Sequence, residues 1–110
     1  MAAQKVPIGL IPIQIKGAFD ELFRREQVGQ EYYRVYVSPS VVPDQYDVQV
    51  VWDGFEQMSI TQRAVWLWER IRKVIPKATQ HSMGNVSAYS AKEVVVADEI
   101  VLREQNAPIF

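Results

Sequence analysis

The chain contains no cysteine and a single histidine, His81, among its 110 residues. Without cysteine it has no disulfide framework, no thiol nucleophile and no iron–sulfur or zinc–thiolate site built from its own residues. This composition is typical of a reducing compartment, and we expect a cytoplasmic protein. The net charge of −1 disfavours binding of nucleic acid over the whole surface, because domains with that function are usually clearly basic.

Long hydrophobic runs are also absent, so no segment is expected to span a membrane. Residues 1–13 are apolar, but Pro7 and Pro12 interrupt them, and they lack the basic opening and cleavage site of a secretory signal. We expect residues 1–13 to form an extended arm on the domain or on a partner, or else a disordered tail. One domain is predicted over residues 14–104 and a C-terminal tail over residues 105–110.

Apolar residues at helical spacing predict a first helix over residues 14–27, ended by Gly29. Residues 31–37 and 46–52 alternate instead and are rich in aromatic and β-branched side chains, which is typical of strands. We expect these two strands to pair as an antiparallel hairpin. The inner face of the first helix is predicted to consist of Ile15, Ala18, Phe19, Leu22 and Phe23.

Ser59 and Gln62 have the spacing of a capping box, in which each side chain bonds a backbone N–H at the start of a helix. The helix predicted there runs to Ile75, because Pro76 ends it. Burial of its apolar face on the sheet should supply much of the stability. That face is expected to consist of Ile60, Ala64, Leu67, Trp68, Ile71, Val74 and Ile75.

The last third of the chain repeats this pattern. A short strand is predicted over residues 86–91, and Ser90 and Glu93 again have capping-box spacing, which predicts a last helix over residues 91–103. The complete order is helix, strand, strand, helix, strand, helix. We therefore expect an α+β fold in which a small mixed or antiparallel three-stranded sheet carries helices on one face.

The side of the long helix opposite its apolar face combines cations with an aromatic residue. This side consists of Arg63, Trp66, Arg70 and Lys73, and Lys77 extends it. Because tryptophan and arginine are enriched at protein interfaces, we predict that these residues bind a partner. Two alternatives stay open. The stripe could contact phosphates and bases of a nucleic acid, or Trp66 could pack under the arm or the last helix while the cations are only solvated.

Two further surfaces each allow two interpretations. Tyr32, Arg34 and Tyr36 share one strand face, which could bind a ligand by stacking or simply stabilise the sheet by cross-strand pairing. The last helix is acidic, so it could contact a second copy of the chain or complement the basic helix internally. Its acidic residues are Glu93, Asp98, Glu99 and Glu104.

No catalytic constellation is visible, and we expect the protein not to be an enzyme. Carboxylates gather around the second strand, but without metal-ligand spacing or a nearby histidine they are typical of turns. They are Asp44, Asp47, Asp53 and Glu56. His81 is a candidate metal or cluster ligand, or else an exposed loop residue without a ligand.

Two runs of residues resemble motifs of the BolA-like family. Residues 46–59 read YDVQVVWDGFEQMS and continue to Arg63, where the family has an FxVxVVSxxFEGxSxxxRH-type run. Residues 89–93 read YSAKE, where the family has a YTPxE-type run that opens the last helix. The resemblance covers about residues 15–100 and includes the order of elements.

The resemblance implies a partner protein. Similar proteins pair with monothiol glutaredoxins and share a [2Fe-2S] cluster, with a family histidine as one ligand. Ser82 stands where that histidine falls, and His81 is one place away, so this chain could supply at most His81 while a partner brings the thiolates. The chain also departs from the family at Gln57 and Ala64, which replace a glycine and a histidine.

These observations predict a non-enzymatic, BolA-like protein-interaction module that takes part in iron–sulfur cluster handling or regulation, with no cofactor of its own. An alternative is a structural or regulatory subunit of an assembly, including a homo-oligomer, in which residues 6–13 and 106–110 dock on neighbours. A nucleic-acid-binding regulator is the third possibility, and the acidic net charge disfavours it.

Overall fold

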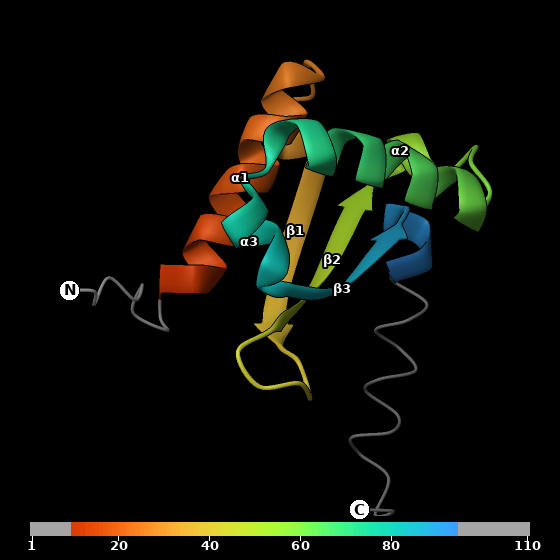
Figure 1. Ribbon diagram of the computed structural model, residues 1–110. Helices are drawn as coiled ribbons and strands as arrows, with labels where there is room; N and C mark the ends of the chain where they lie inside the picture. Colours follow the sequence, from red (N-terminus) through yellow and green to blue (C-terminus); the bar gives the residue numbers. More distant parts are fainter. Residues whose placement is uncertain (1–9, 95–110) are drawn as a thin grey trace, which may run out of the picture.

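The computed structural model describes residues 10–94 of the chain. Within this range the fold is α+β, as predicted, and Figure 1 shows helices packed against one mixed sheet. The elements in order are α1 (Ile11–Arg25), the 3-10 turn η2 (Gln30–Tyr32), β1 (Tyr33–Pro39), β2 (Tyr46–Trp52), the 3-10 turn η3 (Asp53–Phe55), α2 (Ile60–Val74), α3 (Lys77–His81) and β3 (Met83–Tyr89).

The sheet has the order β1-β2-β3 among the described residues. β1 and β2 form the predicted antiparallel hairpin, with Val35 opposite Val50. β3 instead runs parallel to β2, with Val86 opposite Val48, because α2 and α3 carry the chain back across the sheet. The register shifts beside Tyr46, so that β3 contains one extra residue at its start.

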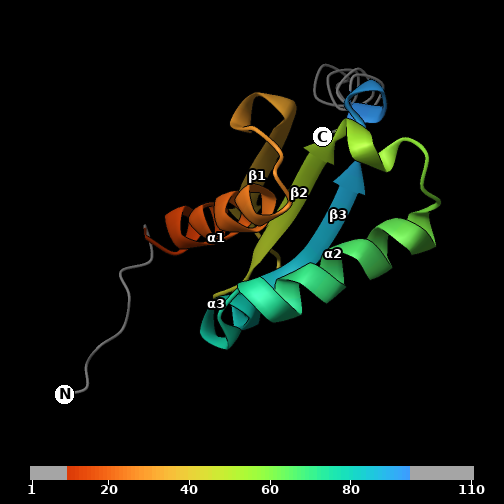
Figure 2. The same ribbon diagram turned by 90° about the horizontal axis from the view of Figure 1, so that it is seen from above.

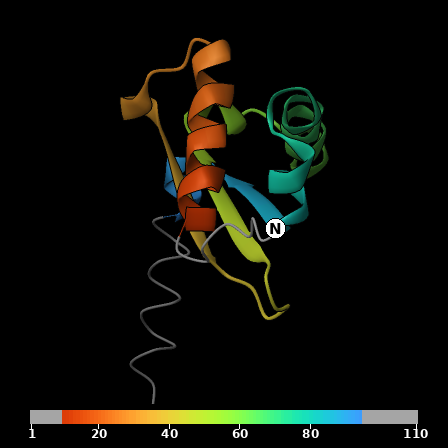
Figure 3. The same ribbon diagram turned by 60° about the vertical axis from the view of Figure 1, so that its left-hand side comes forward.

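α1 and α2 cover the same face of the sheet. Figure 2 shows α1 beside β1 and α2 beside β3, and Figure 3 shows α1 next to the α2–α3 pair. The core between them and the sheet is dominated by aromatic and branched aliphatic side chains. Its fully buried members are Ile15, Phe19, Leu22, Phe23, Val50, Phe55 and Ile71.

α1 begins and ends earlier than predicted. It starts at Ile11 and contains Pro12 in its first turn. Proline is tolerated there because the N–H that it lacks would have no partner within the helix. It ends before Gln27, which adopts φ 61° and lets the Val28 N–H donate to the Phe23 carbonyl at 2.9 Å. The predicted stop at Gly29 and the predicted arm boundary at residue 13 are therefore wrong, while residues 1–9 lie outside the described range.

β2 has the predicted bounds, β1 lies two residues later than the predicted 31–37, and β3 starts three residues and ends two residues earlier than the predicted 86–91. The capping box is confirmed, with the Gln62 N–H donating to Ser59 Oγ at 3.1 Å and the Ser59 N–H donating to Gln62 Oε1 at 2.8 Å. α3 was not predicted, because it is a single short turn after Pro76. Residues 91–94 are helical, as expected of the last helix, and the rest of that helix and the tail lie outside the described residues.

No helix in the described part of the chain is long and apolar enough to cross a membrane.

Loss of the capping box should weaken α2 measurably. We expect Ser59→Ala to lower the free energy of unfolding by about 1 kcal/mol, because the Gln62 N–H loses its acceptor, and Ser59→Asp to retain most of the stability. Thr61→Ala, at an exposed position of the first turn, is the matched control. Urea unfolding followed by tryptophan fluorescence measures this, and equal midpoints for the Ser59→Ala and Thr61→Ala variants would contradict it.

Candidate functional site

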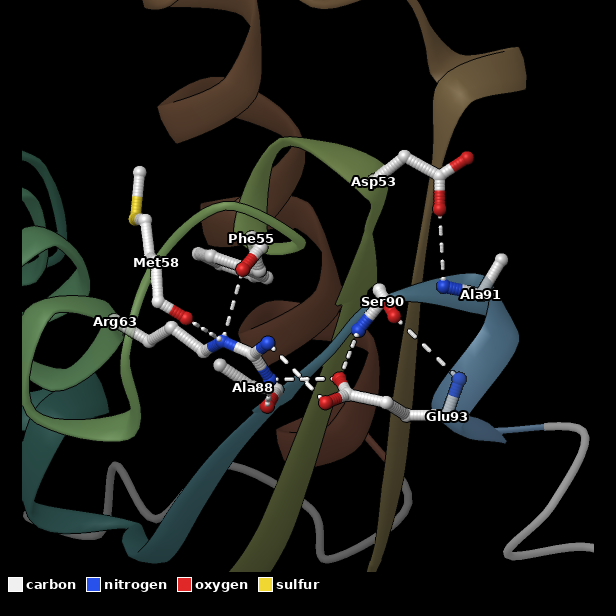
Figure 4. Close-up of polar contacts among 8 residues, drawn as sticks. All are labelled: Asp53, Phe55, Met58, Arg63, Ala88, Ser90, Ala91 and Glu93. Atoms are coloured by element: carbon white, nitrogen blue, oxygen red, sulfur yellow. Dashed lines mark hydrogen bonds and ion pairs between the residues drawn. The ribbon is translucent and has the colours of Figure 1, made fainter.

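Arg63 faces the interior and not the solvent. Its residue surface is only 7% exposed, so the prediction that it belongs to an outer basic stripe is wrong. A buried guanidinium needs acceptors for its N–H groups, and the chain supplies them from three segments. Nε donates to the carbonyls of Phe55 and Met58 at 3.0 and 3.1 Å, and Nη1 donates to the Ala88 carbonyl at 3.1 Å (Figure 4).

Glu93 completes this arrangement. Arg63 Nη1 and Nη2 donate to Oε1 and Oε2 of Glu93 at 2.7 and 3.2 Å, a two-pronged ion pair. The Ser90 N–H also donates to Glu93 Oε1 at 2.7 Å, and the Glu93 N–H donates to Ser90 Oγ at 3.4 Å, so both halves of the predicted second capping box are present. These hydrogen bonds, from Arg63 first and Ser90 second, lower the pKa of the Glu93 carboxyl to about 2. Arg63 thereby connects α2 to the turn before it and to the end of β3.

Trp66 is half-buried, so its indole is neither fully exposed nor fully enclosed. Its ring lies 4.9 Å from Trp52, 5.6 Å from Phe55 and 6.1 Å from Phe23, measured between centroids. The Arg70 guanidinium carbon lies 4.0 Å from the centroid of the same ring, a cation–π contact one turn along α2. Trp66 therefore packs against α1, β2 and η3 of its own chain, whereas the alternative left open placed it under the arm or the last helix.

Arg70 is also engaged within the chain. Its Nε lies 3.1 Å from Glu26 Oε1 after the end of α1, an ion pair without the alignment of a hydrogen bond. Lys73 and Lys77 are exposed at the far end of α2 and at the start of α3. The five residues predicted as one binding surface are thus divided between the core and the solvent, and their role in binding a partner stays a prediction.

His81 is exposed at the last position of α3, immediately before β3. The described residues contain no group of three or more His, Cys, Asp or Glu side chains that could hold a metal ion. Within residues 10–94, His81 is thus a single candidate ligand without a second metal-binding group beside it.

The predicted apolar face of α2 is only partly covered. Leu67, Ile71 and Ile75 are buried, but Ile60 is 82% exposed and Ala64 is exposed as well, so the prediction for these two residues is wrong. The cause is the inward orientation of Arg63. With Arg63 facing the interior, the side of the helix that carries Ile60 and Ala64 faces away from the core.

These uncovered residues line a groove of about 390 Å³ between α2 and β3. Ile60, Ala64 and Trp68 contribute from the helix, and Val86 and Ala88 contribute from the strand. The paired Arg63 and Glu93 close the end of the groove next to the start of the last helix.

The strand beside this groove, β3, is an edge strand of the described sheet. Within residues 10–94, β3 pairs with β2 alone, so one side of its backbone has no strand partner. Its sequence, MGNVSAY, contains neither a charged residue nor proline, the devices that usually protect an edge strand. The opposite edge, β1, carries both Arg34 and Pro39. The two edges therefore differ in the way expected if only β3 accepts another strand.

The outer face of the hairpin shows the predicted exposure of Tyr32, Arg34 and Tyr36. A depression of about 660 Å³ there includes Val51 and Val94 in its lining. Both roles given for these residues, stacking on a ligand and cross-strand pairing, stay predictions. Asp53 has a structural role at this end of the sheet, because its Oδ1 accepts from the Ala91 N–H at 3.0 Å.

Sequence reasoning missed the groove and the Arg63 pair. One signal was present: the predicted apolar face of α2 had seven members, and with Trp66 added it is wider than a helix normally buries on one sheet face. A stripe of this width indicates a second apolar contact.

Comparison of the chain with protein-family models, with curated proteins and with solved structures found no match.

The Arg63–Glu93 pair should make stability depend on acid pH. A carboxyl whose pKa is lowered by folding contributes stability that is complete above its unfolded pKa and is lost as the pH falls through its folded pKa. We expect wild type to be more stable than Glu93→Gln at neutral pH and this difference to shrink between pH 4.5 and about 2. Urea unfolding at a series of pH values measures it.

Two points make the comparison of wild type with Glu93→Gln specific to the Arg63–Glu93 pair. The Glu21 carboxyl also has its pKa lowered to about 2, by Arg24 and Arg25, but it is present in both proteins and cancels in the difference. Glu56→Gln removes an exposed carboxylate outside the Arg63 network and serves as the control. A Glu93→Gln difference that stays constant down to the lowest pH would show that the ion pair does not stabilise the fold.

Proposed function

We propose that this protein is a non-enzymatic protein-interaction module and that its binding surface is the groove between α2 and β3. The observation that carries the proposal is the exposed apolar surface of Ile60, Ala64, Trp68, Val86 and Ala88 beside an edge strand without charges. Burial of such surface against a partner is favourable by about 25 cal/mol per Å² of apolar area.

Several features of the groove support binding of a protein. A tryptophan that lines an apolar groove and remains partly exposed is typical of the residues that dominate interface energies. Among residues 10–94, the only charged side chains in the lining are Arg63 and Glu93, which are paired with each other, so a partner need not desolvate an uncompensated charge of theirs. This proposal moves the predicted partner surface from the basic side of α2 to its apolar side.

A charge placed in the groove should abolish partner binding. We expect proteins captured from native-cell extract by the wild-type chain to be lost with Ala64→Glu, because the carboxylate would have to be buried unpaired. Val65→Glu, at a 53% exposed position that does not line the groove, should retain them. Quantitative mass spectrometry of the three captures makes the comparison. If no protein distinguishes Ala64→Glu from Val65→Glu, the groove is not the binding surface.

A second candidate is the BolA-like role in iron–sulfur cluster handling with a monothiol glutaredoxin. The α+β fold that the resemblance implies supports it, and so does the exposed position of His81, where an imidazole can reach a ligand on another protein. Because the chain has no cysteine, the glutaredoxin would supply every thiolate.

This candidate predicts a visible spectrum that depends on His81. Co-purification with a monothiol glutaredoxin under anaerobic conditions should yield [2Fe-2S] absorbance that changes with His81→Ala, because one ligand of the shared cluster is lost. Ala78→Ser, an exposed change on the same short helix, should leave the spectrum unchanged. Identical spectra for wild type and His81→Ala, or no cluster absorbance that depends on this chain, would refute the role.

A further inference from the structure

The geometry of the groove points to one mode of binding, an inference that rests on the proposed function. We infer that the groove takes an extended segment of a partner protein, which adds to the sheet as a fourth strand beside β3. This segment has apolar residues at alternate positions and an acidic residue at the end that lies near the start of β3.

The backbone of β3 provides the first argument. In a strand, the N–H and C=O groups of every second residue point to the same side, and in the described part of the chain only the side toward β2 is paired. A further strand fits at about 4.8 Å from β3 and satisfies the groups on the other side. Arg63 already donates to the Ala88 carbonyl, so we assign the pairing segment to residues 83–87.

The side chains provide the second argument. Val86 and Ala88 stand opposite Val48 and Val50, whose side chains are buried, so all four face the helices. An added strand would point every second side chain to that same face, below the exposed part of α2. There these side chains would contact Ile60 and Ala64, which the described sheet leaves exposed, and the accessible part of Trp68. A helix in the groove would bury the same apolar residues but leave the β3 backbone unpaired.

The charges provide the third argument. The segment from the end of α2 to the start of β3 carries Arg72, Lys73 and Lys77 and no acidic residue, and all three cations are exposed. Asp44, in the hairpin loop at the same end of the sheet, and Asp47, opposite Asn85 of β3, offset only part of this charge. An acidic residue of the partner is therefore favoured at this end. Since antiparallel pairing is the more stable arrangement, the acidic residue should follow the apolar positions in the partner sequence.

Selection of a phage-displayed library of random dodecapeptides on the full chain tests this inference. We expect enriched peptides with alternating apolar residues followed by Asp or Glu. A synthetic copy of the most enriched peptide should bind Ala64→Glu at least about tenfold more weakly than Val65→Glu, and Lys73→Glu should weaken it at low salt. The mutated positions are exposed in the wild type, so the variants should remain folded.

Two measurements on this peptide distinguish a strand from other shapes. N-methylation of the peptide, one residue at a time, should abolish binding at every second position, because only alternate amides pair with β3. Backbone amide exchange should slow in β3 on binding, while the amides of β1 should not change.

Each other outcome overturns the inference in a recognisable way. If the peptide needs Ala64 but N-methylation shows no period of two and β3 is not protected, the groove binds a different shape and only the proposed function stands. If no selected peptide depends on Ala64, the proposed function fails as well. If the β3 amides are protected in the absence of peptide and this protection rises with protein concentration, the edge is occupied by a second copy of the chain. Protection that is independent of concentration assigns it to residues outside the described range.

Discussion

The hydrogen bonds of Arg63 are the interaction on which the rest of the structure depends. Its guanidinium lies out of solvent and donates five hydrogen bonds, to the carbonyls of Phe55, Met58 and Ala88 and to both carboxylate oxygens of Glu93. A buried cation is tolerated only when its donors are satisfied, so α2 cannot rotate about its axis without a large penalty. This contact therefore determines which residues of the helix face the sheet.

The groove follows from the same constraint. With Arg63 turned inward, Leu67 and Ile71 occupy the core, and Ile60 and Ala64 turn out beside β3. The start of the long helix thus presents apolar side chains next to an unpaired strand edge, and the ion pair with Glu93 closes one end of the resulting site. Arg63 thus stabilises the fold through its hydrogen bonds and at the same time determines which apolar side chains of α2 line the proposed binding surface.

Much of the fold could be predicted because its signals are local. The alternation around Val35 and Val50, the Ser59 capping box and the helical spacing of the α1 apolar residues depend on neighbours a few positions away. The candidate site could not be predicted in the same way. Arg63, Trp66 and Arg70 have the spacing of an exposed basic stripe, and only the positions of Ala88, Phe23 and Glu26 in space show that each of them has a partner within the chain.

The sequence by itself determined the type and order of the two long helices and the three strands, the hairpin and the absence of thiol chemistry, because backbone propensity, capping and composition act over short separations. Tertiary structure alone decided the parallel direction of β3, the rotation of α2 and the location of uncovered apolar surface. These depend on contacts between residues about thirty positions apart, such as Arg63 and Glu93, and the energy of a buried charge depends on where its acceptors lie in space.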